Sequence, residues 1–249
     1  MLKVSIITAC YNNESTIEST IQSVLNQDYK NIEYIVIDGL STDKTLDIVK
    51  KYSDKIIRIV SEKDKGMYDA LNKGIALAGG DVIGFLHADD FYPDQTVISK
   101  VVKRLENAQA DAVYGDLQYV DKNDVLKVTR NWKAGEYSEG YFFNGWMPPH
   151  PTFFVRKNCY EKLGVFNISL MSASDYELML RFIHKNKIKV SYVPEVLVKM
   201  RVGGKSNITL ANRIKANRED RQAWRLNGLT PRFYTLILKP LSKIFQFMK

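Results

Sequence analysis

Hydrophobic and polar positions follow a regular order along the first 90 residues. Four apolar runs are typical of buried strands, at residues 4–9, 32–37, 56–60 and 82–86. Between these runs apolar residues recur three or four positions apart, which predicts a helix after the turn at residues 11–13, a second over 45–52 and a third that stops at Gly79. The alternation predicts an α/β fold with a Rossmann-like, mostly parallel sheet flanked by helices.

The pattern changes after residue 110. Residues 111–128 read as strand, turn and strand, which predicts a hairpin instead of another βα unit. A helix is expected to begin near Asp175 and a strand to run over 195–200. From 233 to 248 apolar residues return at spacings of three and four, which predicts an amphipathic helical extension bent at Pro240. We expect one domain over 1–204 and a helical tail over 205–249.

Composition limits the class of protein. With 249 residues, 45% of them hydrophobic and 26% charged, the chain suits a soluble globular domain. No run approaches the roughly 20 apolar residues that cross a bilayer, and no signal-peptide pattern opens the chain, so a cytoplasmic location is expected. Two cysteines without a Cys-x-x-Cys partner indicate neither a disulfide framework nor a zinc knuckle.

Charge is concentrated at one end. Residues 200–249 hold eleven basic and two acidic side chains, so the charge of this segment is +9. Because the net charge of the whole chain is +8, the charge of the remainder is −1. The tail is therefore expected to meet an anionic surface. A nucleic-acid-binding protein would explain the basic tail but not the acidic strand ends described next, so no nucleic acid is expected.

Polar residues follow the predicted strands where ligands bind in open α/β sheets. Asp38 ends the second strand, where a carboxylate can accept hydrogen bonds from a ribose or a base, whereas Asp43 reads as a helix cap before Thr45. "ITACYNN" after the first strand lacks the glycine-rich dinucleotide fingerprint, which disfavours a dehydrogenase. Asp89 and Asp90 follow the fourth strand, and their mutual repulsion needs a cation, a proton or a polar ligand.

Four ordered segments carry a resemblance: "VSIITACYNN", "IEYIVIDGLSTDKT", "SEKDKGMYDALNKGIALAGGDVIGFLHADD" and "SASDYELMLR". Together, from Lys3 to about Arg201, they resemble the family 2 glycosyltransferases with a GT-A fold, especially those that build bacterial O-antigen and capsule repeat units. The resemblance implies an inverting, metal-dependent enzyme that moves a hexose from a UDP-sugar to a polyprenyl-diphosphate-linked glycan. It also implies a nucleotide-sugar-binding half over 1–115 and an acceptor-binding half over 116–204.

The resemblance assigns the paired acids to a DXD-type site. Asp89 and Asp90 would hold Mn²⁺ or Mg²⁺ across the two phosphates of the donor, with Asp89 the preferred direct ligand. The alternative is a turn that caps the next helix, but Asp94 can fill that role. His87 stands where many relatives carry the first acid, and both contact with ribose or a metal-bound water and a packed imidazole stay open.

The remaining nucleotide-sugar contacts come from the resemblance position by position. They are Thr8, Ala9 and Tyr11 near the base, Asp38 on the base or ribose, Asp64 and Lys65 near the uracil, and Arg201 on the diphosphate. A solvated charge explains Lys65 equally well. The diphosphate match is weaker, because some relatives carry histidine where Val202 stands.

The resemblance places the general base at Asp175, which would remove the proton as an acceptor hydroxyl attacks the sugar. Helix capping by Asp175, or by Ser172 or Ser174, is the alternative. On the acceptor side, Trp146 ends an aromatic stretch and His150 lies between two prolines. The aromatic side chains suit sugar rings and a structural core equally.

Three further readings stay open. The tail from about Arg232 is expected to rest on the inner face of the cytoplasmic membrane, the alternative being a helix docked on the protein's own core. A sugar-nucleotide-forming nucleotidyltransferase would need a glycine-rich, basic phosphate loop, which "TACYNN" is not. A non-catalytic nucleotide-sugar-binding protein would be expected to lose Asp89 or Asp175, and both are present.

Overall fold

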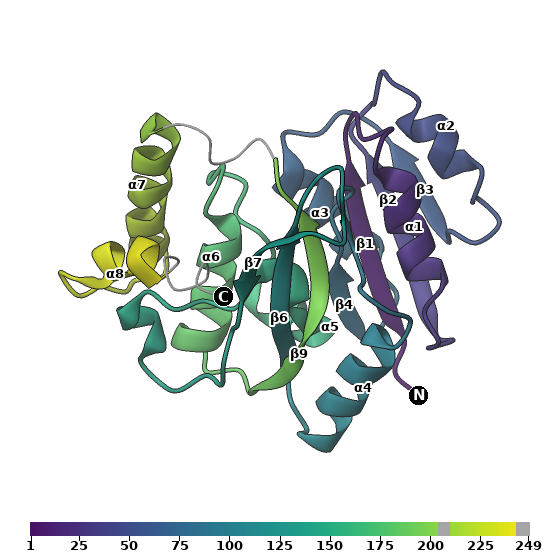
Figure 1. Ribbon diagram of the computed structural model, residues 1–249. Coiled ribbons are helices and arrows are strands. Elements are labelled where there is room, and N and C mark those ends of the chain that lie inside the picture. The colour runs from purple at the N-terminus through teal and green to yellow at the C-terminus, as the bar shows by residue number, and fades with distance from the viewer. Residues whose placement is uncertain (204–209, 243–249) are drawn as a thin grey trace.

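The computed structural model describes the backbone of residues 1–203 and 210–242 and the side chains of 1–203 and 216–241. In this part of the chain one sheet of nine strands has the order β3-β2-β1-β4-β8-β6-β9-β5, with β7 paired to β6. Helices cover both of its faces (Figure 1). The predicted α/β sheet flanked by helices is confirmed.

The first half is a parallel βα repeat. Its elements are β1 (Val4–Cys10), α1 (Ile17–Leu25), β2 (Ile32–Asp38), α2 (Thr45–Lys50), β3 (Arg58–Ser61), α3 (Met67–Leu77) and β4 (Val82–Phe85). β1 pairs in parallel with β2 and β4, and β2 with β3. The predicted elements are therefore correct to within one or two residues, because each strand is an apolar run closed by a polar turn.

The second half is mixed. Its elements are β5 (Asp90–Phe91), α4 (Val97–Asn107), β6 (Ala112–Val120), β7 (Val128–Trp132), η1 (Tyr141–Asn144), η2 (His150–Thr152), β8 (Phe154–Arg156), α5 (Lys157–Leu163), α6 (Ser174–Met179), η3 (Leu180–Lys185), β9 (Val190–Arg201), α7 (Leu210–Leu226) and α8 (Thr235–Ser242). The predicted hairpin is present as β6 and β7, although β7 only begins at Val128. β9 is longer than predicted and lies parallel to β6.

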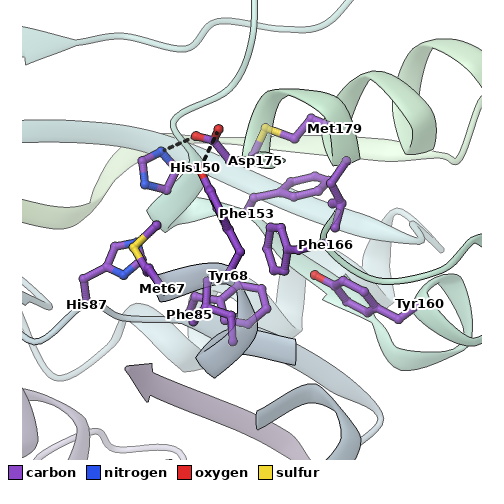
Figure 2. Close-up of a pocket in the computed structure, with 12 residues that line it drawn as sticks. Met67, Tyr68, Phe85, His87, His150, Phe153, Tyr160, Phe166, Asp175 and Met179 are labelled. Carbon is purple, nitrogen blue, oxygen red and sulfur yellow. Dashed lines mark hydrogen bonds and ion pairs between the residues drawn. The ribbon is translucent and has the colours of Figure 1, made fainter. Parts of the chain in front are cut away.

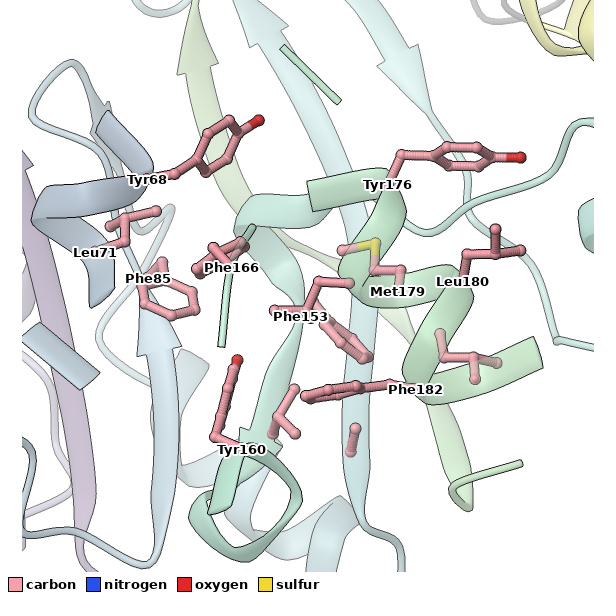
Figure 3. Packing of buried hydrophobic residues seen from close by; sticks show 14 of the residues in the cluster. Tyr68, Leu71, Phe85, Phe153, Tyr160, Phe166, Tyr176, Met179, Leu180 and Phe182 are labelled. Atoms are coloured by element: carbon pink, nitrogen blue, oxygen red, sulfur yellow. The ribbon is translucent and has the colours of Figure 1, made fainter. Parts of the chain in front are cut away.

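Alternating side chains of the strands feed two hydrophobic cores, one on each face of the sheet. In β2, Tyr34 and Val36 enter the core beneath α1 and α4, while Ile35 and Ile37 enter the other. The second core is rich in aromatic rings, which come from α3, β4, α5 and the segments on either side of α6 (Figure 3). These rings build the floor of the site described below.

The C-terminal helices lie against the second half of the molecule, beside α6 (Figure 1). Trp224 of α7 has no exposed surface and its indole N–H donates to the Tyr176 hydroxyl at 3.0 Å. In α8, Lys239 pairs with Asp220 of α7 at 2.5 Å, and Leu236 is buried. The described part of the tail is thus docked on the domain through one face, as the alternative reading had it.

Residues 204–209 and 243–249 lie outside the described residues. The predicted domain boundary at 204 falls in the first stretch. The last predicted apolar positions of the tail, 244, 245 and 248, fall in the second. Among the helices of the described ranges, none has the length and hydropathy to cross a membrane.

Candidate active site

Three loops meet at the carboxyl ends of β1, β2 and β3. The Gly39 N–H after β2 donates to the Cys10 carbonyl of β1 at 2.9 Å. A Cβ on Gly39 would lie 3.1 Å from Asp64 Oδ2 and 3.5 Å from the Tyr11 ring, so glycine permits this close approach. Tyr11 is 53% exposed. The structure therefore brings together Tyr11 and Asp64, two of the predicted nucleotide contacts.

Thr8 and Asp38 lie beneath this surface and have no exposed area. The Thr8 hydroxyl is 3.0 Å from the Tyr34 hydroxyl. Asp38 accepts hydrogen bonds from the hydroxyls of Ser41 at 2.5 Å and Ser61 at 2.6 Å. Asp38 thus holds the loop after β2 in place, whereas Thr8 joins β1 to β2. Contacts of Thr8, Asp38 and the half-buried Ala9 with a nucleotide stay predictions.

The loop before α3 is held by ion pairs. Lys73 Nζ lies 2.6 Å from Asp64 Oδ1 and 2.8 Å from Glu62 Oε1, and the hydrogen bond to Asp64 is the main reason that the pKa of Lys73 is raised. Lys65 is exposed, and its backbone N–H donates to Asp69. Asp64 is therefore fixed by Lys73, while the role of Lys65 near a base stays a prediction.

The paired acids after β4 differ in exposure. Asp90 has no exposed surface, lies in β5 opposite Met200 of β9, and neither of its carboxylate oxygens has a hydrogen-bond partner within the described residues. Asp89 is half-buried. Burial raises the pKa of both carboxyls, and the charge of Asp89 raises that of Asp90 further. A buried carboxylate without hydrogen-bond partners beside a half-buried one creates a local demand for positive charge.

Arg201 at the end of β9 supplies part of that charge. Its Nη1 donates to the Asp89 carbonyl at 2.7 Å and its Nη2 to Ser19 Oγ at 3.0 Å, and its guanidinium lies 4.7 Å from the centre of the Phe91 ring. The structure thus places Arg201 next to the acid pair. Its contact with a diphosphate stays a prediction.

The acid pair fits a hard divalent cation. Asp94 accepts the Thr96 N–H at 2.7 Å ahead of α4, so the pair is not needed as a cap there. In residues 1–203 and 216–241 no group of three or more His, Cys, Asp or Glu side chains gathers around one point. Mg²⁺ and similar ions are commonly held by one or two carboxylates together with substrate phosphates, which is what Asp89, with Asp90 behind it, can offer.

Asp175 lies at the start of α6 and faces other site residues (Figure 2). Its Oδ1 accepts the Tyr176 N–H at 2.8 Å and the Tyr68 hydroxyl at 3.3 Å, and its Oδ2 lies 3.1 Å from His150 Nδ1. Tyr68 was missed by the sequence reasoning, since its phenol belongs to a helix face that reads as core.

Glu219 of α7 binds the backbone just before α6, while Asp175 accepts an N–H of the first turn, that of Tyr176. Glu219 of α7 accepts the backbone N–H groups of Ser172 at 2.7 Å and Ala173 at 3.2 Å. This contact joins residues 47 positions apart, so the local sequence could not reveal it. Asp175 is left with one carboxylate oxygen directed at His150.

His87 lies between the acids and the base. It is 8% exposed, its Nε2 has no partner among the described residues, and its ring centre is 5.4 Å from that of His150. Burial, and next the nearby His150, lower the pKa of His87 to about 3, so the imidazole stays neutral. His87 is therefore a buried imidazole that also lines the pocket. Its contact with a ribose or a metal-bound water stays a prediction.

His87, His150 and Asp175 form one side of a pocket (Figure 2). Its other lining residues are almost all apolar or aromatic: Met67, Tyr68, Leu71, Phe85, Phe153, Tyr160, Phe166, Leu178 and Met179. Trp146 does not line it. The Trp146 indole donates to the Ala134 carbonyl at 2.8 Å and the ring packs on Tyr137, with 5.1 Å between ring centres. Its acceptor-side role stays a prediction.

A mostly parallel sheet flanked by helices, with polar and acidic residues at the carboxyl ends of β1, β2 and β4, is the architecture of the GT-A class of nucleotide-sugar transferases. The family model described as "Glycosyl transferase family 2" matches residues 5–169. The chain belongs to this family, and the resemblance drawn from the sequence is confirmed.

One curated relative is the Escherichia coli protein WfaP, named UDP-Glc:alpha-D-GlcNAc-diphosphoundecaprenol beta-1,3-glucosyltransferase. It is 35% identical over 186 residues, which cover 73% of this chain and 70% of WfaP. An uncharacterized glycosyltransferase of Methanocaldococcus jannaschii is 28% identical over 82% of this chain and 72% of its own length.

Solved structures share the fold. Residues 1–349 of Staphylococcus aureus TarS with UDP-GlcNAc give a TM-score of 0.72 at 19% identity, covering 91% of this chain and 65% of that one. The mannosyltransferase PcManGT of Pyrobaculum calidifontis with GDP-Man and Mn²⁺ gives 0.68 at 21% identity, covering 95% and 68%. The chain thus spans slightly less than two thirds of the TarS fragment, and the GT-A fold is shown.

Proposed function

We propose that the chain is an inverting, metal-dependent glycosyltransferase that moves a hexose from a UDP-sugar to a polyprenyl-diphosphate-linked glycan during synthesis of a bacterial surface polysaccharide such as O-antigen or capsule. The observation that carries the proposal is the position of Asp175. Its carboxylate is held by Tyr68 and His150 at the mouth of a pocket that also reaches His87, two residues before Asp89.

In the proposed mechanism the residues divide into two sets. Tyr11 and Asp64 bind the uracil, and Arg201 holds the diphosphate against Asp89 and Asp90. Mn²⁺ or Mg²⁺, when bound there, neutralises the charge that develops on the leaving UDP. From the other side Asp175 removes the proton of the acceptor hydroxyl while that oxygen attacks the anomeric carbon, which inverts its configuration.

The names of the relatives support the proposed donor, acceptor and metal. The name of WfaP gives a UDP-sugar donor and a diphosphoundecaprenol acceptor, TarS was solved with UDP-GlcNAc, and PcManGT was solved with Mn²⁺. Family membership does not support a nucleotidyltransferase. A non-catalytic binding protein is the remaining alternative, and it predicts nucleotide-sugar binding without turnover.

We further propose that the protein works at the inner face of the cytoplasmic membrane. One side of α8 is docked, but Phe233, Ile237 and Leu241 are 92%, 60% and 46% exposed at a spacing of four residues. They form an apolar stripe on a segment with no acid after Asp220. Such a stripe next to cations suits an anionic lipid surface that carries the acceptor.

The test is UDP release from a panel of UDP-sugars, measured with a GlcNAc-diphospholipid acceptor and with Mn²⁺, Mg²⁺ or EDTA. Asp89→Ala should abolish transfer and Mn²⁺-dependent UDP binding, while the exposed turn variant Asp54→Ala should keep both. Full activity in EDTA would overturn metal dependence. Binding of UDP-sugars without release of UDP under any condition would favour the non-catalytic alternative.

A further inference from the structure

The C-terminal helices contact the segment that carries Asp175 on both sides of this residue. α7 and α8 lie beside α6 (Figure 1), and both follow residues 5–169, which the family model matches. Glu219 of α7 binds the backbone just before Asp175, while Trp224 and Asn227 of α7 bind side chains just after it. The described part of the tail therefore borders the proposed base.

Glu219 makes the contacts that precede the base. Its Oε2 accepts the Ser172 N–H at 2.7 Å, the Ser172 hydroxyl at 2.9 Å and the Ala173 N–H at 3.2 Å. Glu219 is 8% exposed, so little water can reach this place to replace its oxygen. Loss of the carboxylate would leave these donors without an acceptor, which releases the turn before α6.

Two other residues of α7 hold the first turn of α6. The Trp224 indole N–H donates to the Tyr176 hydroxyl at 3.0 Å. Asn227 Nδ2 donates to Glu177 Oε1 at 3.1 Å. The segment around Asp175 thus has attachment points before and after the base, and these points belong to the tail.

We propose that Glu219 is a positioning residue for Asp175. By holding residues 172 and 173 it fixes the direction from which the carboxylate of Asp175 meets the acceptor hydroxyl. This inference rests on the proposed glycosyltransferase function and extends its site to the C-terminal helices.

The position of Asp175 depends on two supports. Tyr68 of α3 and His150 contact its carboxylate from the body of the domain. The backbone of Asp175 lies two residues after Ala173, so a shift of the turn moves the carboxylate away from both contacts. A misplacement of about 1 Å can slow an enzymatic reaction by about 100-fold. Glu219 therefore acts on the chemical step.

Donor binding should depend little on Glu219. The predicted nucleotide contacts Tyr11 and Asp64 lie in the loops after β1 and β3, and Asp64 is held there by Lys73. A positioning role thus predicts a lower kcat with unchanged donor affinity. A role in stability alone predicts a lower melting temperature with unchanged kcat for the folded protein.

The experiment measures kcat, donor KM, UDP affinity and melting temperature on the full-length protein, with a short-chain acceptor and at a temperature where every variant is folded. Glu219→Ala should lower kcat by about 10–100-fold and change donor KM and UDP affinity by less than about twofold. Glu219→Gln keeps an oxygen that can accept the N–H groups and should recover most of the loss. If Glu219→Ala does not fold, Glu219→Asp withdraws the acceptor by one methylene group and should lower kcat by about tenfold.

Glu33→Ala is the matched control. Glu33 is also buried, at 5% exposure, and also accepts three hydrogen bonds, but these come from Lys3, Ser5 and Gly79 and not from the segment around Asp175. The control should lower the melting temperature and leave kcat of the folded protein unchanged.

The outcomes separate the inference from the proposed function. Wild-type kcat in folded Glu219→Ala or Glu219→Asp overturns the positioning role, as does a loss that Glu219→Gln fails to recover. An equal loss of kcat in Glu33→Ala, or a donor KM that rises as much as kcat falls, also overturns it. Absence of UDP release by the wild type with every donor contradicts the proposed function itself, and the wild-type assay alone detects that case.

Discussion

At the scale of the residue, the assignment of a base depends on what surrounds Asp175. Its Oδ1 accepts the Tyr176 N–H and the Tyr68 hydroxyl, whereas Oδ2 lies beside His150. We expect Asp175→Asn to lower kcat by roughly 10²–10⁴-fold with little change in donor affinity, because the amide keeps the contacts to Tyr176 and Tyr68 but cannot take a proton.

The measurement is steady-state kinetics together with UDP-sugar binding. Asp47→Asn, in the first turn of α2 and exposed, serves as the control and should retain full turnover. Loss of folding by circular dichroism in Asp175→Asn would instead favour a structural role for this carboxylate.

His150 is expected to position Asp175 through the 3.1 Å contact between Nδ1 and Oδ2. His150→Ala should lower kcat by about tenfold without raising the donor KM, since the base loses an orienting partner but the nucleotide contacts are unchanged. His150→Asn places an amide nitrogen near the position of Nδ1 and should recover much of the loss. Equal kcat for both variants would contradict a positioning role.

At the scale of the element, Glu33 of β2 ties two other elements to its strand. It accepts hydrogen bonds from Lys3 Nζ at 2.8 Å, Ser5 Oγ at 2.5 Å and the Gly79 N–H after α3 at 2.6 Å. Burial alone raises the pKa of this carboxyl, but the three hydrogen bonds and Lys3 lower it overall below its usual 4.5. The ionised form is therefore favoured in the folded protein.

A carboxyl whose pKa is lower in the folded than in the unfolded state stabilises the fold above about pH 4.5, and this stability is lost as the pH falls through the folded value. We expect Glu33→Gln to reduce the free energy of unfolding by about 1–3 kcal/mol at pH 7 and to flatten its decline below pH 4.5. Urea titrations at several pH values measure both. Glu106→Gln, exposed on α4, should change neither.

The apolar stripe formed by Phe233, in the turn before α8, and by Ile237 and Leu241 of α8 gives a sharper test of membrane binding than removing the helix. Deleting α8 would uncover the surface on which Leu236 and Lys239 dock. Changing the three stripe residues to serine should instead weaken binding to anionic vesicles at least about tenfold, because each buried apolar side chain contributes to partitioning. UDP release with a short-chain acceptor should persist.

Vesicle sedimentation at low and high salt measures this binding. A control variant with serine at three exposed apolar positions elsewhere, Ile57, Leu126 and Ile168, should bind like the wild type. Unchanged vesicle binding by the stripe variant would show that α8 is not a membrane contact.

At the scale of the whole molecule, the sequence predicts what is local. Strand and helix bounds of the first half follow from periodicity, and the predicted caps at Asp43 and Asp94 each accept the N–H two residues on. The contacts of Tyr68 with Asp175 and of Glu219 with Ser172 could not be predicted, because they join residues 107 and 47 positions apart. The docking of α8 was also hidden, since its buried lysine reads as a surface charge.

The arrangement of β5 has a consequence for how the protein is made. Asp89 and Asp90 follow β4 in the middle of the chain. Among the described strands, however, β5 pairs with β9 alone, and Arg201 at the end of β9 donates to the Asp89 carbonyl. During synthesis the parallel strands β1 to β4 can assemble early, and α1 already contacts the acid loop through Thr20 and Ser23. β5 gains its strand partner and Arg201 only after about residue 201 has left the ribosome. We therefore expect a chain that stops before β9 to hold a formed sheet with an incomplete acid loop, and to bind a UDP-sugar more weakly than a chain that includes β9.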